Sequence, residues 1–282
     1  MIKVVISGAV VPRYLKILRA VIEEEDMELA GAIEGKGHPL IGKDAGNAAG
    51  MEEYGLGICS NLEEIHGEWD ILIEFSTPEA TLSHLPAAAG KSKCVVIGTT
   101  GFTGEQKDKI RDFSSKIPVL LSPNMSIGVN LLFKIAGEVA KVLGTEYDAE
   151  IVETHHRLKK DAPSGTALKL AESITNSRGQ DIPATSPPSG ERIKNKGLVY
   201  GRHGTTGERT RGEIGIHAVR GVTVTGEHTA IFAGQSERIE LTHRAESREG
   251  FVRGTIRAIK FMAGAKPGFY SMQDVLGFAH KG

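Results

Sequence analysis

The regular alternation of short apolar strands with helical segments along the first 143 residues is the feature that most constrains the fold. A β-branched run from Ile2 to Ser7 ends at Gly8, and the segment from Pro12 to Glu25 carries apolar residues at helical spacing. Further strands are predicted at 28–33, 70–75, 94–97 and 119–121, with helices at 78–89 and 127–143. This order predicts an α/β domain with a doubly wound, Rossmann-like parallel sheet.

The residues that follow these strands are candidates for a ligand site, because parallel sheets of this kind bind ligands at the carboxyl ends of their strands. Glu34 lies about 26 positions after Gly8, close to the spacing at which dinucleotide folds place an acid that holds the ribose hydroxyls. A G-x-x-G-x-x-G turn would also have glycines at 11 and 14, where this chain has Val11 and Tyr14, so the turn alone is a weak signal. The other candidate loop residues are Gly98, Thr99 and Thr100, then Ser122, Pro123, Asn124 and Met125. The Gly98–Gly101 loop could also be merely a tight turn, but four loops at one edge favour a site.

The stretch E-T-H-H-R-L-K-K-D-A-P-S-G-T-A-L, from Glu153 to Leu168, carries a second candidate site. Residues 147–153 predict a strand that leads into it, and Pro163 suits the first turn of a helix capped by Asp161 or Ser164. Gly165 and Thr166 then lie at the helix start, where backbone N–H groups and the helix dipole attract anions. The pattern predicts a carboxylate-binding site.

The charged side chains of this stretch can support proton transfer. Lys159 can donate a proton or hold a second carboxylate, and His155 and His156 titrate near neutrality. Neighbouring strand residues face opposite sides, so only one of the two histidines is expected to reach a given ligand atom. An ordinary solvated turn is the alternative. A metal site with Glu153 as a ligand is disfavoured, because neighbouring residues cannot converge on one ion and the cysteines lie far off in sequence.

The second half of the chain changes character. The stretch 179–212 is rich in glycine, proline and serine and contains six basic residues that suit either a small anion or a solvated loop: Arg192, Lys194, Lys196, Arg202, Arg209 and Arg211. Strand-like segments at 213–219, 222–227, 229–233 and 238–244 predict consecutive antiparallel pairing, hence a second, α+β domain with a mostly antiparallel sheet. Its uncovered face would need a second copy of the chain.

Length and charge limit the remaining possibilities. The 282 residues suffice for two domains, expected at 1–126 with 245–282 and at 127–244. The net charge of −1 argues against nucleic-acid partners, and no apolar run reaches the roughly 20 residues that span a bilayer. Met1 opens directly into a strand, so a cytoplasmic protein is expected. Cys59 and Cys94 form no C-x-x-C pair, and buried reduced thiols are expected.

The central stretch resembles the signature of the 4-hydroxy-tetrahydrodipicolinate reductase (dihydrodipicolinate reductase) family of bacterial diaminopimelate and lysine biosynthesis. Further segments are similar to that family in the same order: D-I-L-I-E-F-S-T-P-E-A, V-V-I-G-T-T-G-F, N-M-S-I-G-V-N, V-Y-G-R-H-G-T-T-G-E-R, V-T-G-E-H-T-A-I-F and M-Q-D-V-L. The resemblance covers nearly the whole chain.

The resemblance implies NADH- or NADPH-dependent reduction of the cyclic dicarboxylate 4-hydroxy-tetrahydrodipicolinate, with loss of water, to tetrahydrodipicolinate by a homotetramer. It implies that His155 is a proton donor or acceptor and Lys159 a second proton donor. It also implies that His156, Gly165 and Thr166 contact the substrate carboxylates. The implied cofactor contacts are Gly8, Ala9, Val10, Val11, Pro12 and Arg13 of the first turn, Glu34, the 98–100 loop and the 122–125 segment.

The first turn departs from the family pattern. Where the family usually reads G-A-x-G-R-M-G, this chain reads G-A-V-V-P-R-Y from Gly8 to Tyr14. A Cβ at Val11 and a ring at Tyr14 are expected to lower nucleotide affinity or reshape the loop. Many relatives also follow the ribose acid with an arginine, where this chain has Gly35 and then Lys36, so NADH is expected to serve at least as well as NADPH. Two alternatives remain: a different two-domain dehydrogenase acting on an amino acid or amino aldehyde, and a non-catalytic relative that binds only the dicarboxylate.

Overall fold

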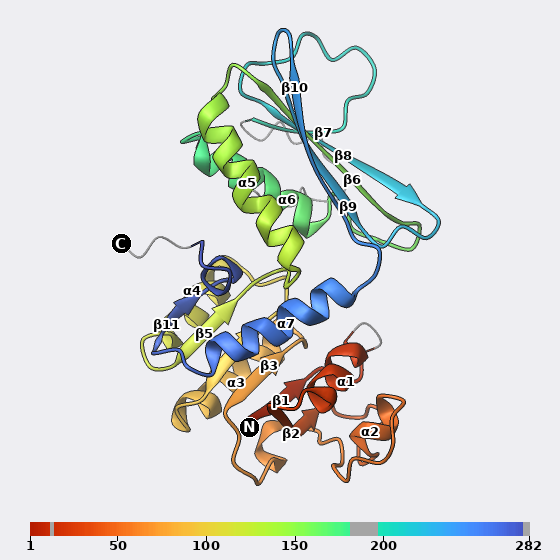
Figure 1. The fold of residues 1–282 in the computed structure, drawn as a ribbon, viewed down its shortest axis with the longest axis vertical. Helices are drawn as coiled ribbons and strands as arrows, with labels where there is room; N and C mark the ends of the chain where they lie inside the picture. The colour runs from red at the N-terminus through yellow and green to blue at the C-terminus, as the bar shows by residue number, and fades with distance from the viewer. Residues whose placement is uncertain (12–13, 181–196, 279–282) are drawn as a thin grey trace. The chain divides into compact units, whose positions relative to one another are not determined.

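The computed structural model describes residues 1–11, 14–180 and 197–278, and the chain divides into two compact units (Figure 1). The first comprises Met1–Ile127 with Phe251–Gly282, and the second comprises Gly128–Gly250. Pro12 and Arg13 of the first turn lie outside the described residues, as do Arg192, Lys194 and Lys196 of the basic stretch. None of the helices described is both long enough and apolar enough to cross a bilayer.

The first unit is built on a six-stranded sheet in the order β11-β5-β4-β3-β1-β2, with parallel pairing between all neighbours. The doubly wound sheet expected from the sequence is therefore confirmed. The strands are β1 (Ile2–Ser7), β2 (Met27–Ile33), β3 (Ile71–Glu74), β4 (Cys94–Ile97), β5 (Pro118–Leu121) and β11 (Gly268–Tyr270). The helices along this part of the chain are α1 (Leu15–Glu23), α2 (Ala45–Ala48), η1 (Leu62–Glu64), α3 (Pro78–Gly90), α4 (Gly104–Phe113), α7 (Glu249–Met262) and α8 (Met272–Val275).

Both faces of this sheet are buried, which explains the nearly continuous apolar strands. Successive side chains of a strand point to opposite faces, so Val4 belongs to the cluster with α1 and α7 while Val5 belongs to the cluster with α3 and α4. The α1 helix begins at Leu15, later than the expected start at Pro12, because residues 8–10 still form a turn.

The second unit carries a five-stranded sheet in the order β10-β9-β6-β8-β7, with α5 and α6 on one of its faces (Figure 1). Its strands are β6 (Asp148–His156), β7 (Leu198–Tyr200), β8 (Ile214–Gly221), β9 (Glu227–Ala233) and β10 (Arg238–Arg244), and its helices are α5 (Ile127–Leu143) and α6 (Gly165–Ser177). Aliphatic side chains such as Ile151, Leu170 and Ile216 form the core between the sheet and the helices.

The prediction of consecutive antiparallel strands is wrong for the first part of this sheet. It is mixed: β8 pairs in parallel with β6 and β7, while β9 pairs antiparallel with β6 and β10. Because β7 and β8 both run parallel to β6, the chain must return to the same end of the sheet before each of them; α6 lies between β6 and β7, and residues 201–213 lie between β7 and β8. Because β8 and β9 lie on opposite sides of β6, the residues 222–226 must pass from one side to the other. They form a connection and not the predicted strand.

Candidate active site

A cavity of about 620 Å³ lies in the first unit and is lined by residues that follow β1, β2, β3 and β4. It brings together several residues predicted to bind a nucleotide, namely Gly8, Val11, Glu34, Thr99 and Thr100. Lys36, Ser76 and His84 also line it. The parallel sheet accounts for this convergence, since its strand ends share one edge.

Gly8 begins the first turn and has a left-handed backbone conformation, which favours glycine. Its φ is +75°, and a Cβ there would lie 2.3 Å from the Phe75 carbonyl oxygen. The Gly8 and Ala9 amides donate to the Ile33 carbonyl at 3.0 and 3.2 Å, and the Val10 amide donates to Glu34 Oε2 at 3.3 Å. The carboxylate of Glu34 is thereby held beside the turn.

Tyr14 occupies the position of the third glycine of the family pattern, and its ring packs against Phe75. The ring stacks on Phe75, with centroids 4.4 Å apart, and lies 6.3 Å from the ring of Phe251. Phe75 in turn lies against the backbone of Gly98, where a Cβ would be 2.0 Å from the Phe75 ring. The turn and the Gly98–Thr100 loop are therefore in contact through one aromatic side chain.

The Gly98–Thr100 loop is fixed by a buried polar network that the sequence did not indicate. The amides of Gly98 and Thr99 donate to the carbonyl of Glu74 at 2.9 and 3.1 Å. The carboxylate of Glu74 is fully buried and contacts His84 Nδ1 at 2.6 Å and the Ser76 hydroxyl at 2.7 Å. Together these contacts position the loop against the cavity.

The segment Ser122–Met125 follows β5, next to β4 in the same sheet. The Ser122 hydroxyl donates to the Asn124 carbonyl at 2.8 Å, and the Ser126 amide donates to Asn124 Oδ1 at 2.9 Å. Met125 is fully buried, whereas Pro123 is exposed. The segment is thus a structured turn at the same sheet edge.

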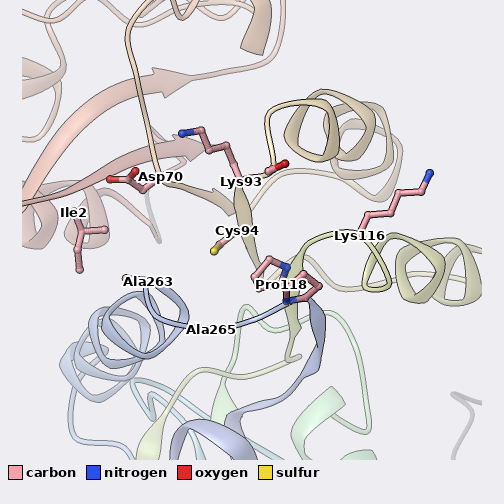
Figure 2. Close-up of a pocket in the computed structure, with 10 residues that line it drawn as sticks. Ile2, Asp70, Lys93, Cys94, Lys116, Pro118, Ala263 and Ala265 are labelled. Atoms are coloured by element: carbon pink, nitrogen blue, oxygen red, sulfur yellow. The ribbon is translucent and has the colours of Figure 1, made fainter.

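A second cavity of about 560 Å³ lies near the opposite strand ends, around the starts of β1, β4 and β5 (Figure 2). Cys94 lines it and donates a weak hydrogen bond to the Met262 carbonyl at 3.3 Å. Burial raises the pKa of the Cys94 thiol, which keeps the thiol protonated at neutral pH. Cys59 and Cys94 are both unbridged and only partly buried, so the expectation of buried thiols is met in part.

The second candidate site lies in the second unit, where strand register places four side chains on the face that α6 covers. Glu153 and His155 are two residues apart on β6, so their side chains share one face of the sheet. On the neighbouring strands, His228 of β9 is the register partner of Glu153, and Arg220 of β8 is that of His155. His156 is the last residue of β6, and its side chain is half-buried.

Glu153 is the buried centre of this cluster. Its carboxylate accepts two hydrogen bonds from Arg220 at 3.0 Å each, one from the Ser164 amide at 3.1 Å, and one from His155 Nδ1. Burial by itself raises the pKa of Glu153, but the hydrogen bonds and charges of His155 and Arg220 lower it to about 2. Glu153 is therefore a carboxylate at neutral pH.

His228 supports the start of α6. Its Nε2 lies 3.0 Å from the Ser164 hydroxyl, which caps α6 by accepting the Ala167 amide at 3.1 Å. Burial, followed by the charge of His155, lowers the pKa of His228 to about 3, so it is neutral. Ser164, and not Asp161, is the cap.

Lys159 and the helix start form the more open side of the site. Lys159 Nζ contacts both carboxylate oxygens of Asp161 at 2.9 Å. Gly165 is the first residue of α6 and is exposed, with open space around its Cα, and Thr166 follows it. The buried Nδ1 of His156 has no hydrogen-bond partner within the described part of the chain.

Sequence reasoning missed Arg220 and His228. Both occur in the second half of the chain, 67 and 64 positions from the groups they bind in the central motif. The quoted V-T-G-E-H-T-A-I-F segment, which contains His228, was the only signal for either of them.

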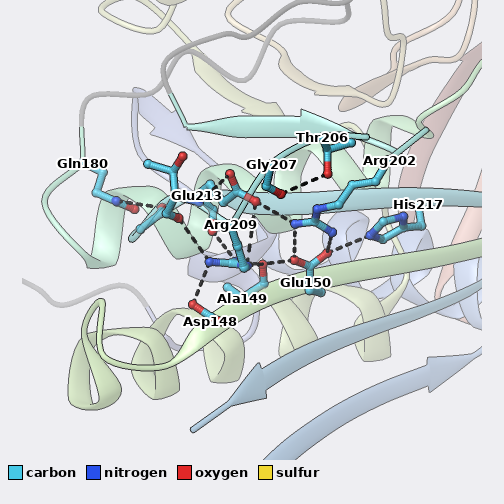
Figure 3. Close-up of polar contacts among 12 residues, drawn as sticks. Asp148, Ala149, Glu150, Gln180, Arg202, Thr206, Gly207, Arg209, Glu213 and His217 are labelled. Atoms are coloured by element: carbon cyan, nitrogen blue, oxygen red, sulfur yellow. Dashed lines mark hydrogen bonds and ion pairs between the residues drawn. The ribbon is translucent and has the colours of Figure 1, made fainter. Parts of the chain in front are cut away.

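Two arginines of the basic stretch, Arg202 and Arg209, bind carboxylates of the second unit (Figure 3). Arg202 binds Glu150 at 2.7 and 3.0 Å and Glu213 at 2.7 Å, while Arg209 binds Asp148 at 2.7 Å and Glu150 at 3.2 Å. Burial raises the pKa of Glu150, but hydrogen bonds from Arg202, His217 and Arg209 bring it down to about 2. These arginines are neutralised by carboxylates of the same unit.

Comparison with known proteins finds relatives that match nearly the whole chain. The model described as dihydrodipicolinate reductase, N-terminus, matches residues 2–125, and that of the C-terminus matches residues 128–276. A 4-hydroxy-tetrahydrodipicolinate reductase from Citrifermentans bemidjiense is 46% identical over 277 residues, covering 98% of this chain and 99% of the relative. One from Syntrophus aciditrophicus is 44% identical over 278 residues, covering 99% of each. A solved structure of a dipicolinate-bound dihydrodipicolinate reductase from Paenisporosarcina sp. TG-14 is similar with a TM-score of 0.73 and 26% identity, covering 97% of this chain and 99% of that one.

Proposed function

The chain belongs to the dihydrodipicolinate reductase family, and from this premise we propose which of its residues carry the reaction. The reaction is the NADH- or NADPH-dependent reduction of 4-hydroxy-tetrahydrodipicolinate to tetrahydrodipicolinate, in which the 4-hydroxyl group leaves as water, in diaminopimelate and lysine biosynthesis. The observation that carries our assignment is the joining of His155, through Glu153, to the exposed start of α6. A proton-transfer group and an anion site are thereby held by one buried carboxylate.

The cavity of the first unit fits a dinucleotide. It has a glycine turn at Gly8, an acid at Glu34 beside that turn, and the buried, hydrogen-bonded Thr99 at its wall. Glu34 would hold ribose hydroxyls, and Lys36 at the rim would attract a 2′-phosphate. Bound NADH or NADPH supplies the hydride. The protein binds and orients the dinucleotide through these residues, with the Ser122–Met125 segment at the same sheet edge.

The start of α6 is the proposed carboxylate site. Gly165 and Thr166 present backbone at the positive end of a 13-residue helix, and Gly165 lets an anion approach closely. His156 has a buried ring nitrogen without a partner among the residues described, and a carboxylate oxygen would satisfy it. The solved relative bound to dipicolinate is consistent with a cyclic dicarboxylate here.

His155 and Lys159 are the proposed proton-transfer residues. Hydride addition makes a ring atom electron-rich, and a positioned acid protonates it in the same step or soon after. Lys159 is 20% exposed at its side chain and bonded to an exposed carboxylate, Asp161, so it can exchange that partner for the substrate. A cation beside the ring also stabilises the negative charge that develops.

The unit boundaries suggest how the roles divide. We assign nucleotide binding to the first unit, and substrate binding and oligomerisation to the second. The sheet face opposite α5 and α6 carries Val152, Val219 and Ile231 among charged residues, and a homotetramer would cover it. A cytoplasmic location fits a biosynthetic enzyme that uses this cofactor.

A dicarboxylate-binding relative with impaired nucleotide binding is the second candidate. It is favoured only by Val11 and Tyr14, both of which line the nucleotide cavity. Calorimetric titration of NADH and of NADPH, with and without pyridine-2,6-dicarboxylate, separates the two. Nucleotide binding that tightens with the dicarboxylate supports the reductase. Dicarboxylate binding without nucleotide binding supports the second candidate and contradicts our cofactor assignment.

A further inference from the structure

We propose that Nε2 of His155 is the atom that exchanges protons, because Glu153 binds Nδ1 and Gly226 places no side chain beside Nε2. Arg220 and His228 are the positioning residues that hold this arrangement. The inference rests on the proposed role of His155 in proton transfer. It goes further by naming the reacting atom and the residues that select it.

The Nδ1 atom of His155 is committed to Glu153. This carboxylate has no exposed surface and accepts hydrogen bonds from Arg220 and the Ser164 amide as well. An ionised carboxylate can only accept hydrogen bonds, so the proton between the two residues belongs to His155 Nδ1. Neutral His155 is therefore the Nδ1–H tautomer, and its lone pair lies on Nε2.

The Nε2 edge of His155 lies beside a glycine, Gly226. A Cβ on Gly226 would lie 3.2 Å from Nε2 of His155, which is tighter than most Cβ contacts, and 3.4 Å from Cδ2. Gly226 precedes β9, in the connection that passes from β8 across the end of β6. The absence of a side chain at this position therefore avoids a close contact with the Nε2 edge of the ring.

Arg220 and His228 couple this arrangement to the carboxylate site. Arg220 holds both oxygens of Glu153 and also donates to the Asp161 carbonyl at 2.7 Å, which ties the loop before α6 to the same anchor. The ring of His228 lies edge-on to that of His155, with centroids 5.1 Å apart, while its Nε2 meets Ser164. The ring orientation and the start of α6 are thus set together.

The proton balance of the step is simple. Nε2 first takes a proton from solvent, which gives an imidazolium that still donates through Nδ1 to Glu153. When the hydride has added to the ring and a neighbouring atom holds an electron pair, that pair forms the new bond to the proton. The Nε2–H bond breaks, its electrons remain on Nε2, and neutral His155 returns in the Nδ1–H tautomer.

The test reads the tautomer directly, by ¹⁵N NMR of the imidazole nitrogens in the full chain labelled at histidine, with His155 assigned from its loss in His155→Gln. The wild type should show the Nδ1–H tautomer. In Glu153→Gln the amide oxygen can still accept from Arg220 Nη2 and the Ser164 amide, while the NH₂ group loses the bond from Arg220 Nη1 and donates to His155 Nδ1, so the tautomer should switch to Nε2–H. The turnover number should fall by about 100-fold, the size of a general acid–base contribution.

The matched control is Glu150→Gln. Glu150 lies on the same strand, has a similarly lowered pKa and binds two arginines, but faces the opposite side of the sheet. That variant should keep both the His155 tautomer and the turnover. Gly226→Ala should keep the tautomer and lower the turnover, and it gives a second test if Glu153→Gln does not fold.

Two results overturn the inference: an Nε2–H tautomer in active wild-type protein, or unchanged turnover in a folded Gly226→Ala or Glu153→Gln variant. The tautomer is measured without substrate, so the proposed function fails separately. Wild-type protein that binds nucleotide but does not reduce 4-hydroxy-tetrahydrodipicolinate would refute that function, whatever the tautomer.

Discussion

Replacing Ser164 by alanine should destabilise the substrate site more than an ordinary loss of a helix cap. Ser164 is 2% exposed, and its hydroxyl both accepts the Ala167 amide and bonds to His228, which is 3% exposed. Loss of a serine cap costs about 1 kcal/mol of unfolding free energy. A buried polar group left without its partner costs about 1–3 kcal/mol more. The sum is about 2–4 kcal/mol.

Thr103→Ala provides the matched control. Thr103 caps α4 by accepting the Gln106 amide at 3.2 Å, but its other surroundings are exposed and include no buried histidine. Its loss should therefore cost only about 1 kcal/mol. A difference of about 2 kcal/mol between the two variants corresponds to roughly 30-fold in an opening equilibrium.

Amide hydrogen exchange followed by mass spectrometry measures both openings in the full chain. In Ser164→Ala, exchange of peptides covering 165–177 should be strongly accelerated relative to wild type. In Thr103→Ala, exchange of peptides covering 104–113 should be accelerated much less. Pyridine-2,6-dicarboxylate should also bind Ser164→Ala more weakly, while NADH affinity stays unchanged. Equal acceleration in the two variants would refute the reasoning that His228 depends on Ser164.

Four further results are expected. Lys159→Ala should lower turnover by about 100-fold and leave the calorimetric affinity for NADH unchanged, and normal turnover would remove Lys159 from the mechanism. Lys36→Ala should weaken NADPH relative to NADH by roughly twofold to fivefold in steady-state kinetics, since an exposed ion pair contributes little. Gly98→Ala should lower NADH affinity and reduce the free energy of unfolding, measured by chemical denaturation, by about 1–3 kcal/mol, because its Cβ would meet the Phe75 ring at 2.0 Å. The pKa of Glu153 is lowered from 4.5 to about 2, so ionised Glu153 stabilises the fold by about 3 kcal/mol above pH 4.5, and this stabilisation is lost as the pH falls through 2. In acid titration, the unfolding free energy of Glu153→Gln should therefore fall less steeply with decreasing pH than that of the wild type.

Sequence patterns predicted the elements whose residues carry their own signal. The β-branched runs of β1 and β4 and the long apolar periodicity of α5 lie where they were expected. The α4 helix was missed because only Ile110 of its ten residues is buried, so it has almost no apolar stripe. The parallel pairing of β8 depends on the connections from β6 to β7 and from β7 to β8, which local patterns do not contain.

The same distinction applies to the candidate site. His155, Lys159 and Gly165 share one motif, and their local order already suggests an acid–base pair beside a helix start. Arg220 and His228 reach the motif only through strand register, since one residue of slip in β8 or β9 would turn either side chain to the other face. Residues that perform chemistry can thus be read from a motif, whereas residues that position them require the fold.

The altered first turn illustrates how such a fold absorbs an unusual residue. A glycine at position 14 would let a helix start close to the strand, and a tyrosine prevents this. Here the helix begins at Leu15, and the ring of Tyr14 fills space against Phe75. Val11 and Tyr14 consequently form part of the cavity wall, and the cavity retains Glu34 and Thr100. Phe75 also packs against Gly98, so the tyrosine at position 14 contacts, through Phe75, a second loop of the nucleotide cavity. Tyr14→Gly should therefore change nucleotide affinity through the Gly98 loop as well as through the first turn.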